Sequence, residues 1–294
     1  MKGKVLVVGA AGQLGCELSR TAPKTIELIA LTESELDITD QAVVLEWINT
    51  NCPDWIINAA AYTAVDRAEE QSELAYRVNR DGAANMALAA KQSGAKLIHI
   101  STDFVFDGCK SSPYQVDDLP NPRNVYGASK QAGDEAILST LSGDAVIIRT
   151  AWVYSSHGQN FVKTMLRLMS ERDELGIVAD QIGTPTWAHG LALMVWQVMD
   201  ASLKGIYHWT DAGVASWYDF AVAIYEEATA LGLLEGRVCK IKPIRTQDYP
   251  TAATRPACSA LDKTLTWNTL ATEPDHWRVA LRNMLVELLP VQNN

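Results

Sequence analysis

The sequence predicts an α/β protein built on a doubly wound parallel sheet, and three features support this fold class. Short runs rich in β-branched residues recur along the first half of the chain, and helix-like segments fill the intervals between them. The runs are almost continuously apolar, which is typical of parallel strands covered by helices on both faces. Strand, helix and strand in repetition build such a sheet. The expected strands are 4–9, 26–31, 55–60, 96–101 and 145–150.

Helical patterns occupy the intervals and much of the second half. Residues 41–51 and 74–94 lie between expected strands, and Gly94 closes the second segment as a typical C-terminal cap. After about residue 150 the alternation of strands and helices loosens. We expect further helices at 160–172, 186–200 and 216–232, and one more strand at 205–210.

Two lobes follow from this order. Residues 1–150 are predicted to form a dinucleotide-binding Rossmann domain. Residues 151–294 are predicted to form mainly a smaller C-terminal substrate-binding lobe that contributes partly back to the Rossmann sheet. The prolines and threonines of 243–259 predict an ordered loop without regular structure.

The composition argues against several classes of function. The formal charge is −10 and the basic residues form no run, so we expect no nucleic acid partner. The five cysteines are widely spaced and lack a CxxC pattern, which indicates reduced thiols in a cytoplasmic protein. The apolar run after the first lysines soon ends in glycines and is interpreted as a strand rather than a signal peptide. The apolar stretch 190–199 is about half a membrane span, so no membrane role is expected.

A glycine-rich turn, GAAGQLG, places Gly9, Gly12 and Gly15 between the first expected strand and the first helix. A side chain there would block the backbone from approaching a pyrophosphate, and the helix N-terminus offers N–H donors with positive partial charge. A simple tight turn is the alternative, but the position between strand and helix favours a dinucleotide site.

The second expected strand ends where a dinucleotide would place its adenosine ribose. An acidic residue at that tip would favour NADH and a basic residue NADPH. Here the tip carries Leu31 and Thr32, followed by Glu33 and Glu35, with no nearby lysine or arginine. The choice between NADPH and NADH therefore stays open. Asp37 is expected either to contact the adenine, together with its neighbour Ile38, or to cap the following helix.

The sequence YGASK places Tyr126 and Lys130 four residues apart, on one face of an expected helix. The nearby ammonium is expected to lower the pKa of the tyrosine, which would make it an effective proton donor near neutral pH. Ser101 and Thr102 end the fourth strand, at the edge where such sheets bind ligands. A hydroxyl at this edge would hold a carbonyl oxygen while it accepts a proton, as carbonyl reduction requires.

Several motifs together resemble one family. The glycine turn, NAAAYTAVDRAE, STDFVFDG, NVYGASKQAGDEAI, RTAWVYS, NFVKTMLRL, DQIGTPTWA and TRPACSALD are similar, in this order and over nearly the whole chain, to motifs of the dTDP-4-dehydrorhamnose reductases. These are extended short-chain dehydrogenase/reductases. The resemblance implies reduction of the 4-keto group of dTDP-4-dehydro-L-rhamnose by NADPH or NADH, for cell-surface polysaccharide. It implies a small nucleotide-sugar substrate.

The resemblance also implies roles for individual residues. Tyr126 matches the proton donor, Lys130 the residue that holds the nicotinamide ribose and tunes the tyrosine, and Thr102 the hydroxyl beside the carbonyl. The implied cofactor-binding residues, besides Tyr126 and Lys130, are Gly9, Gly12, Gln13, Leu14, Asp37, Ile38, Ala61, Tyr62 and Thr63. The implied substrate-binding residues, besides Thr102, are Asp103, Trp152, Asn160, Phe161 and Arg255. Trp152 would pack on the sugar ring, and the guanidinium of Arg255 suits a diphosphate.

Some members of this family bind Mg²⁺ through clustered glutamates at a dimer interface. Glu17 and Glu287 match two of these positions, but His189 stands at the third. Mg²⁺ prefers oxygen ligands, so an imidazole weakens the site. We therefore predict no metal requirement, and expect a monomer or a homodimer.

Two other functions are compatible with these motifs. A nucleotide-sugar epimerase or dehydratase would use the same fold, although Phe104 follows Asp103 where dehydratases usually carry a further acidic residue. A catalytically silent, dinucleotide-binding regulatory subunit is the third hypothesis, because fold alone does not fix function. The presence of Thr102, Tyr126 and Lys130 together argues against silence.

Overall fold

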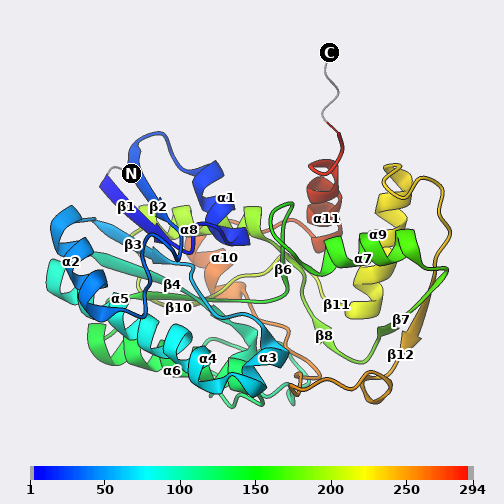
Figure 1. Cartoon of the computed structure of the whole chain (residues 1–294), viewed down its shortest axis with the longest axis horizontal. Helices are drawn as coiled ribbons and strands as arrows, with labels where there is room; N and C mark the ends of the chain where they lie inside the picture. Colours follow the sequence, from blue (N-terminus) through cyan, green and yellow to red (C-terminus); the bar gives the residue numbers. More distant parts are fainter. Residues whose placement is uncertain (1–2, 291–294) are drawn as a thin grey trace.

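The computed structural model describes residues 3–290, and its centre is a six-stranded parallel sheet (Figure 1). The strands stand in the order β10-β5-β4-β3-β1-β2, which is a doubly wound arrangement and confirms the predicted fold class. All five strand pairs are parallel. The strands are β1 (Gly3–Val8), β2 (Ile26–Leu31), β3 (Trp55–Asn58), β4 (Lys96–Thr102), β5 (Val146–Thr150) and β10 (Gly205–His208).

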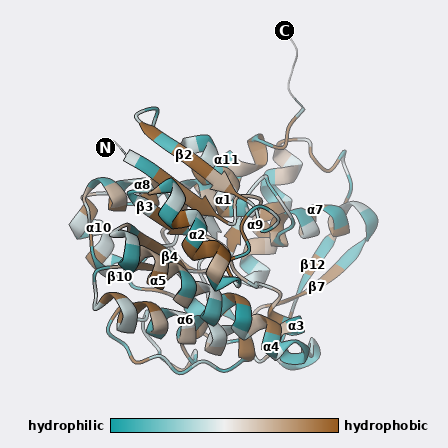
Figure 2. Cartoon of the chain, turned by 60° about the vertical axis from the view of Figure 1, so that its left-hand side comes forward, coloured by the Kyte–Doolittle hydropathy of each residue, from teal (hydrophilic) through white to brown (hydrophobic). Residues whose placement is uncertain are grey.

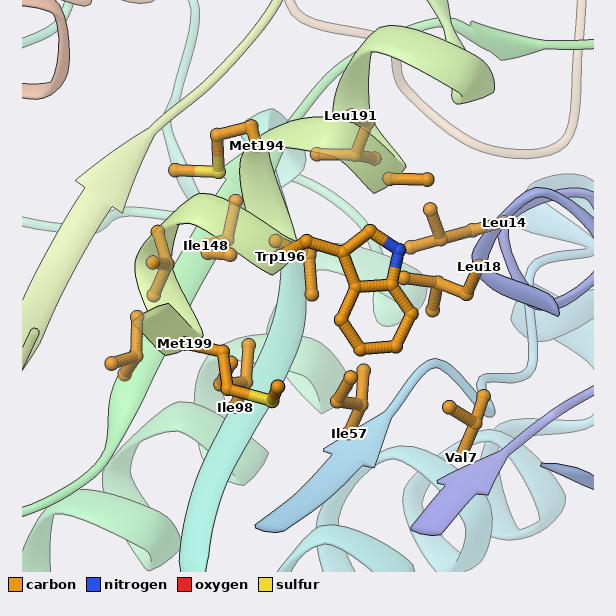
Figure 3. Packing of buried hydrophobic residues seen from close by; sticks show 14 of the residues in the cluster. Val7, Leu14, Leu18, Ile57, Ile98, Ile148, Leu191, Met194, Trp196 and Met199 are labelled. Carbon is orange, nitrogen blue, oxygen red and sulfur yellow. The ribbon is translucent and has the colours of Figure 1, made fainter. Parts of the chain in front are cut away.

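Both faces of this sheet are buried. Val5 and Val7 point to a core shared with α1 (Gln13–Thr21) and α8 (Ala188–Asp200), where Trp196 lies over the strands (Figure 3). The alternate residues of β1 point to the opposite core. Continuous apolarity along the strands is therefore explained by a cover on each side (Figure 2). The opposite face is covered by α2 (Gln41–Asn51), α5 (Ala83–Ser93) and α6 (Val125–Leu141).

The expected helix at 74–94 is not one regular helix. It divides into α4 (Ser72–Tyr76), the π-helical segment η1 (Arg77–Gly82) and α5. Gly82 allows close packing here, because a β-carbon on it would lie 2.6 Å from Cδ1 of Ile38. Gly94 has a φ of 76° and ends α5 as expected. A π-helical turn inside a helix is frequently found at a functional site.

The second half of the chain contributes a separate hydrophobic core between Tyr154 and Leu285, and the elements around this core are called the smaller lobe. Two short strands, β7 (Glu174–Val178) and β12 (Lys240–Ile244), pair in parallel beside its helices (Figure 1). The expectation of an irregular loop at 243–259 is wrong at its start, because β12 includes Pro243 and Ile244 on a sheet edge that tolerates proline. The helices of this lobe are α7 (Phe161–Glu171), α9 (Trp217–Ala230) and α11 (Trp277–Val286).

Further short elements complete the described chain. Residues of the second half return to the first sheet, since β10 pairs with β5 and α8 packs against α1. The remaining elements are α3 (Val65–Glu70), η2 (Asp103–Val105), β6 (Val153–Tyr154), β8 (Ile182–Gly183), β9 (Thr186–Trp187), β11 (Ala215–Ser216), η3 (Thr246–Asp248) and α10 (Thr264–Leu270). All five cysteines are free thiols, as expected. Within residues 3–290, no helix combines the length and apolarity needed to cross a membrane.

Candidate active site

The glycine turn connects β1 to α1 at the carboxyl edge of the sheet. Gly9 has a φ of 82°, and a β-carbon on it would lie 2.6 Å from the backbone nitrogen of Ala60. A β-carbon on Gly15 would lie 2.3 Å from the carbonyl oxygen of Gly9. Gly12 is less confined by protein atoms, and no side chain caps the helix that begins after it. The free amino end of α1 therefore fits a pyrophosphate.

The loop after β2 is held by its own side chains. Glu35 Oε2 accepts hydrogen bonds from the backbone nitrogen of Thr32, at 2.8 Å, and from its hydroxyl, at 2.7 Å. These bonds lower the pKa of Glu35. Asp40, not Asp37, caps α2, and Asp37 instead accepts from the nitrogen of Thr39. The side chain of Ile38 is buried in the core next to α5.

The segment after β3, which contains Ala61, Tyr62 and Thr63, is fixed by a residue that the sequence did not reveal. Asn79, in η1, accepts from the nitrogen of Tyr62 at 2.9 Å and donates to its carbonyl oxygen at 3.1 Å. The same amide donates to the hydroxyl of Ser129, next to Lys130. Asn79 therefore ties the expected cofactor wall to α6.

Thr102 and Tyr126 are brought together by close packing of α6 on η2. Gly127 follows the tyrosine, and a β-carbon on it would lie 2.2 Å from the carbonyl oxygen of Phe104. Asn124 caps α6 by accepting from the nitrogen of Gly127 at 2.8 Å. The tyrosine therefore stands in the first turn, where the side chain of Thr102 is near enough to influence its pKa.

The acid–base properties of the pair differ from the expectation. Burial raises the pKa of Tyr126 to about 12, with Thr102 acting in the opposite direction. Lys130 does not lower it, because its Nζ is directed away, to the carbonyl oxygen of Ile100 at 2.6 Å. Burial also lowers the pKa of Lys130 itself to about 8. The expected lowering of the tyrosine pKa is therefore wrong for this arrangement, and the phenol is held in its protonated, donating form.

Asp103 follows Thr102 into the protein interior. Its Oδ1 accepts from the threonine hydroxyl at 3.1 Å, and burial raises its pKa to about 6. The threonine also accepts from the nitrogen of Phe104, at 3.2 Å. Asp103 thus orients the threonine hydroxyl rather than lining an open surface.

An aromatic stack lies beside this edge, in the smaller lobe. Trp152 has a φ of 48° and stacks on Trp217, with ring centroids 3.5 Å apart. A β-carbon on Gly183 would lie 2.6 Å from the Trp152 ring, so only glycine leaves room for it. The ring of Phe161 lies 4.6 Å from that of Trp217. No motif in the sequence pointed to Trp217.

A cavity of about 530 Å³ extends from this stack along α7 and β7. Phe161, Trp217 and Arg255 line it, and Arg255 with Trp152 also lines a smaller hollow next to Phe104. The Arg255 guanidinium forms two bonds to the carboxylate of Asp66, at 3.0 and 2.6 Å. A larger cavity, of about 710 Å³, lies at the amino ends of β3 and β4. Parallel sheets bind ligands at the carboxyl ends of their strands, so we assign the substrate site to the cavity of about 530 Å³.

Asn160 connects the two lobes. Its Nδ2 donates to Oε1 of Gln13, at 2.9 Å, and its Oδ1 caps α7 by accepting from the nitrogen of Lys163. Gln13 in turn donates to the carbonyl oxygen of Val153. Leu14, the next residue, is buried against the sheet. Asn160, at the start of α7, therefore contacts the glycine turn through Gln13.

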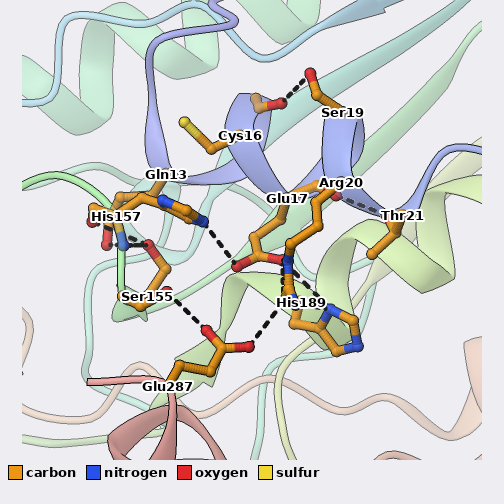
Figure 4. Close-up of polar contacts among 12 residues, drawn as sticks. Gln13, Cys16, Glu17, Ser19, Arg20, Thr21, Ser155, His157, His189 and Glu287 are labelled. Atoms are coloured by element: carbon orange, nitrogen blue, oxygen red, sulfur yellow. Dashed lines mark hydrogen bonds and ion pairs between the residues drawn. The ribbon is translucent and has the colours of Figure 1, made fainter. Parts of the chain in front are cut away.

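The three residues matched to a family metal site do lie together, with an arginine among them (Figure 4). Arg20 Nη2 is 2.7 Å from Glu17, 3.0 Å from Glu287 and 3.0 Å from Nδ1 of His189. Across residues 3–290, no group of three or more acidic, histidine or cysteine side chains is arranged to hold a metal. A guanidinium already lies between the two carboxylates and bonds to both, so these residues do not fit Mg²⁺.

The sheet, the glycine turn and the threonine–tyrosine pair define an extended short-chain dehydrogenase/reductase. The chain belongs to the family described as RmlD substrate binding domain, whose model matches residues 3–289. A dTDP-4-dehydrorhamnose reductase from Aggregatibacter actinomycetemcomitans is 45% identical over 289 residues, covering 96% of this chain and 98% of the relative. The resemblance seen in the motifs is confirmed.

Solved structures agree with this family. A dTDP-4-dehydrorhamnose reductase from Clostridium acetobutylicum superposes with a TM-score of 0.92 at 39% identity, covering 97% of this chain and 99% of the other. One from Bacillus anthracis, in complex with NADP, has a TM-score of 0.91 at 38% identity and covers 98% and 100%.

Proposed function

We propose that this chain reduces the 4-keto group of dTDP-4-dehydro-L-rhamnose to dTDP-L-rhamnose, with NADPH or NADH as the reductant. The observation that carries the proposal is the close packing of Gly127 on Phe104, which brings Tyr126 near Thr102 at the carboxyl end of β4. The names of its relatives support the substrate. The NADP complex of the Bacillus anthracis relative supports NADPH, while Glu33 and Glu35 after β2 would favour NADH.

The residues of the site divide the work of a carbonyl reduction. When bound, the nicotinamide would supply the hydride. Negative charge then develops on the carbonyl oxygen, and the protonated phenol of Tyr126 is the group that donates to it. The Thr102 hydroxyl, whose single proton is donated to Asp103 in the free protein, would turn that proton to the same oxygen and hold it in place. Lys130 provides positive charge one helical turn away.

The cofactor and substrate approach from opposite lobes in this proposal. Gly9, Gly12, Gln13 and Leu14 would receive the pyrophosphate at the amino end of α1. The adenosine would lie at the loop of Asp37 and Ile38, and the nicotinamide half along the wall that Asn79 fixes. That wall consists of Ala61, Tyr62 and Thr63.

The sugar and its nucleotide would occupy the smaller lobe. Trp152, supported by its stack on Trp217, would pack on the sugar ring. The cavity along α7 is about 530 Å³ and would hold the nucleotide, with Phe161 and Arg255 in its wall. We further propose that the protein works in the cytoplasm, as a monomer or a homodimer.

Steady-state kinetics with the purified chain test the function. Adding dTDP-4-dehydro-L-rhamnose should oxidise NADPH or NADH stoichiometrically, with dTDP-L-rhamnose as the product. Sugar conversion without net cofactor oxidation would indicate an epimerase or dehydratase instead. Cofactor binding without any turnover, on a panel of dTDP- and UDP-linked keto sugars, would indicate a silent subunit.

A further inference from the structure

A buried polar cluster lies behind Lys130, away from the substrate side. His99 on β4 places Nε2 3.2 Å from Nζ of Lys130, which also donates to the carbonyl oxygen of Ile100. Asp134, one turn further along α6, places Oδ1 3.8 Å from the same imidazole nitrogen. It accepts from Ser101 at 2.8 Å. His99, Lys130 and Asp134 are each at most 1% exposed.

The histidine is an exception on its face of the sheet. Leu97 precedes it by two residues on β4, and Ile147 is its register partner on β5. Both belong to the apolar core under α5 and α6. An apolar side chain at 99 would leave the buried ammonium of Lys130 with one acceptor fewer. The polar residue at this position is therefore explained by its contact with Lys130 rather than by packing alone.

Its charge state follows from its surroundings. Burial and the ammonium of Lys130 hold the pKa of His99 well below its usual range, so the imidazole is neutral. A neutral ring has one acceptor nitrogen, and the nitrogen that faces an ammonium must be the acceptor. Nε2 is therefore the acceptor, and Nδ1 carries the proton. Within the described residues, Nδ1 has no hydrogen-bond partner.

Charged groups reach Lys130 from several elements. Asp134 and Tyr126 lie on its own helix, and Asp134 is approached by Arg149 Nε from β5, at 3.6 Å. A protonated imidazole would place a third cation beside one buried carboxylate. Two donors of the Lys130 ammonium are directed to β4, which leaves one donor for the ligand side.

We propose that His99 is a positioning residue for the reduction: its neutral Nε2 and the carbonyl oxygen of Ile100 form a two-acceptor seat that keeps the Lys130 ammonium charged and fixed against β4, one helical turn from Tyr126. This inference rests on the proposed function for its catalytic meaning. The seat itself is a property of the resting protein, so it can be measured without any substrate.

The first test uses the unaltered chain. ¹⁵N NMR of histidine-labelled protein near pH 7 should show His99 as a neutral ring with the proton on Nδ1. A ring protonated on Nε2, or on both nitrogens, would overturn the proposal. This result does not depend on which sugar the enzyme reduces, or on whether it reduces one.

The second test changes the acceptor. Gln places its amide oxygen near the position of Nε2, whereas Asn places it near Nδ1, so His99→Gln should keep the seat and His99→Asn should remove it. Burial lowers the pKa of Lys130 to about 8, so the ammonium is charged at neutral pH. Losing an acceptor lowers its pKa, so NMR of labelled lysines should show a downward shift of about one pH unit in His99→Asn and none in His99→Gln.

Kinetics then connect the seat to function. The alkaline limb of the kcat profile should shift downward by the same amount in His99→Asn and be restored in His99→Gln. His208→Gln, in another buried histidine, is the matched control and should leave the Lys130 titration unchanged. The same Lys130 pKa in His99→Asn and His99→Gln would contradict the proposed role of the Nε2 acceptor. Normal NMR shifts without any turnover would count against the proposed function alone.

Discussion

Gly127 lies so close to Phe104 that a β-carbon on the glycine would stand 2.2 Å from the carbonyl oxygen of the phenylalanine. This approach lets α6 rest on the segment that follows Thr102. Tyr126 is carried to the threonine by the same contact. The reactive pair therefore depends on a residue that has no side chain.

Gly127→Ala should separate the helix from η2 and reduce both activity and stability. Overpacking of this kind costs roughly 1–3 kcal/mol, because the added carbon meets backbone rather than a flexible side chain. We expect a lower denaturation midpoint and a fall in kcat that exceeds the change in cofactor affinity. Gly190→Ala is the control, since its β-carbon would meet only Asp211 at an ordinary 3.7 Å. Similar behaviour of the two variants would contradict the packing argument.

Tyr126→Phe should leave cofactor binding intact and slow turnover by about 100-fold or more, the usual scale for a lost general acid. Cofactor affinity can be measured by fluorescence titration, and kcat by steady-state assay. Tyr225→Phe removes a hydroxyl from a surface helix and is the control. Near-normal turnover of Tyr126→Phe would exclude the phenol as the proton donor.

Chelation should have no effect on this enzyme, because Arg20 already occupies the position between Glu17 and Glu287. Activity and melting temperature are expected to be the same with and without EDTA. A large loss of activity on chelation would show that the cluster holds a metal despite the arginine.

Removing that arginine should instead reduce stability. Arg20→Ala leaves the fully buried carboxylate of Glu17 without its main partner. Such a loss costs roughly 1–3 kcal/mol in the free energy of unfolding. Arg167→Ala breaks an exposed pair with Glu171 and should cost under about 1 kcal/mol. Chemical denaturation of both variants, with the native chain, gives the comparison.

Asp211 should make stability fall as the pH rises. Burial raises its pKa to about 8 in the folded protein, from roughly 3.9 in an unfolded chain. The folded state therefore binds more protons across this range, and its advantage is lost as the pH rises toward 8. Asp211→Asn imitates the protonated acid, and should flatten the pH dependence and raise the melting temperature at pH 7.5. The exposed Asp144→Asn should change neither, and an unchanged slope in Asp211→Asn would contradict the assignment.

Much of the fold could be predicted because each strand is apolar on both faces. The strand at 205–210 could be recognised from its run of apolar residues. Its pairing with β5 could not be predicted from that run. Helical periodicity cannot distinguish a regular helix from a π-helical turn, so η1 and its Asn79 were missed. Asn79 stands among the charged residues Arg77, Arg80 and Asp81, so the sequence pattern does not mark it as buried.

The proximity of Thr102 and Tyr126 could be predicted from the sequence, whereas several side-chain contacts around them could not. Thr102 and Tyr126 belong to motifs that fix their elements, and packing of those elements brings them together. The direction of Lys130 depends on a rotamer, and a long side chain reaches several partners from one backbone position. The ion pair between Arg20 and Glu287 joins two residues that are 267 positions apart in the chain. No local sequence pattern encodes such a contact.

The outermost strand β10 has a practical consequence for dissecting this enzyme. It comes from the second half of the chain and covers the edge of β5. A fragment ending near residue 150 would expose that edge as an open row of backbone donors and acceptors, which invites aggregation. Halves produced separately are therefore expected to recover function only when they are mixed.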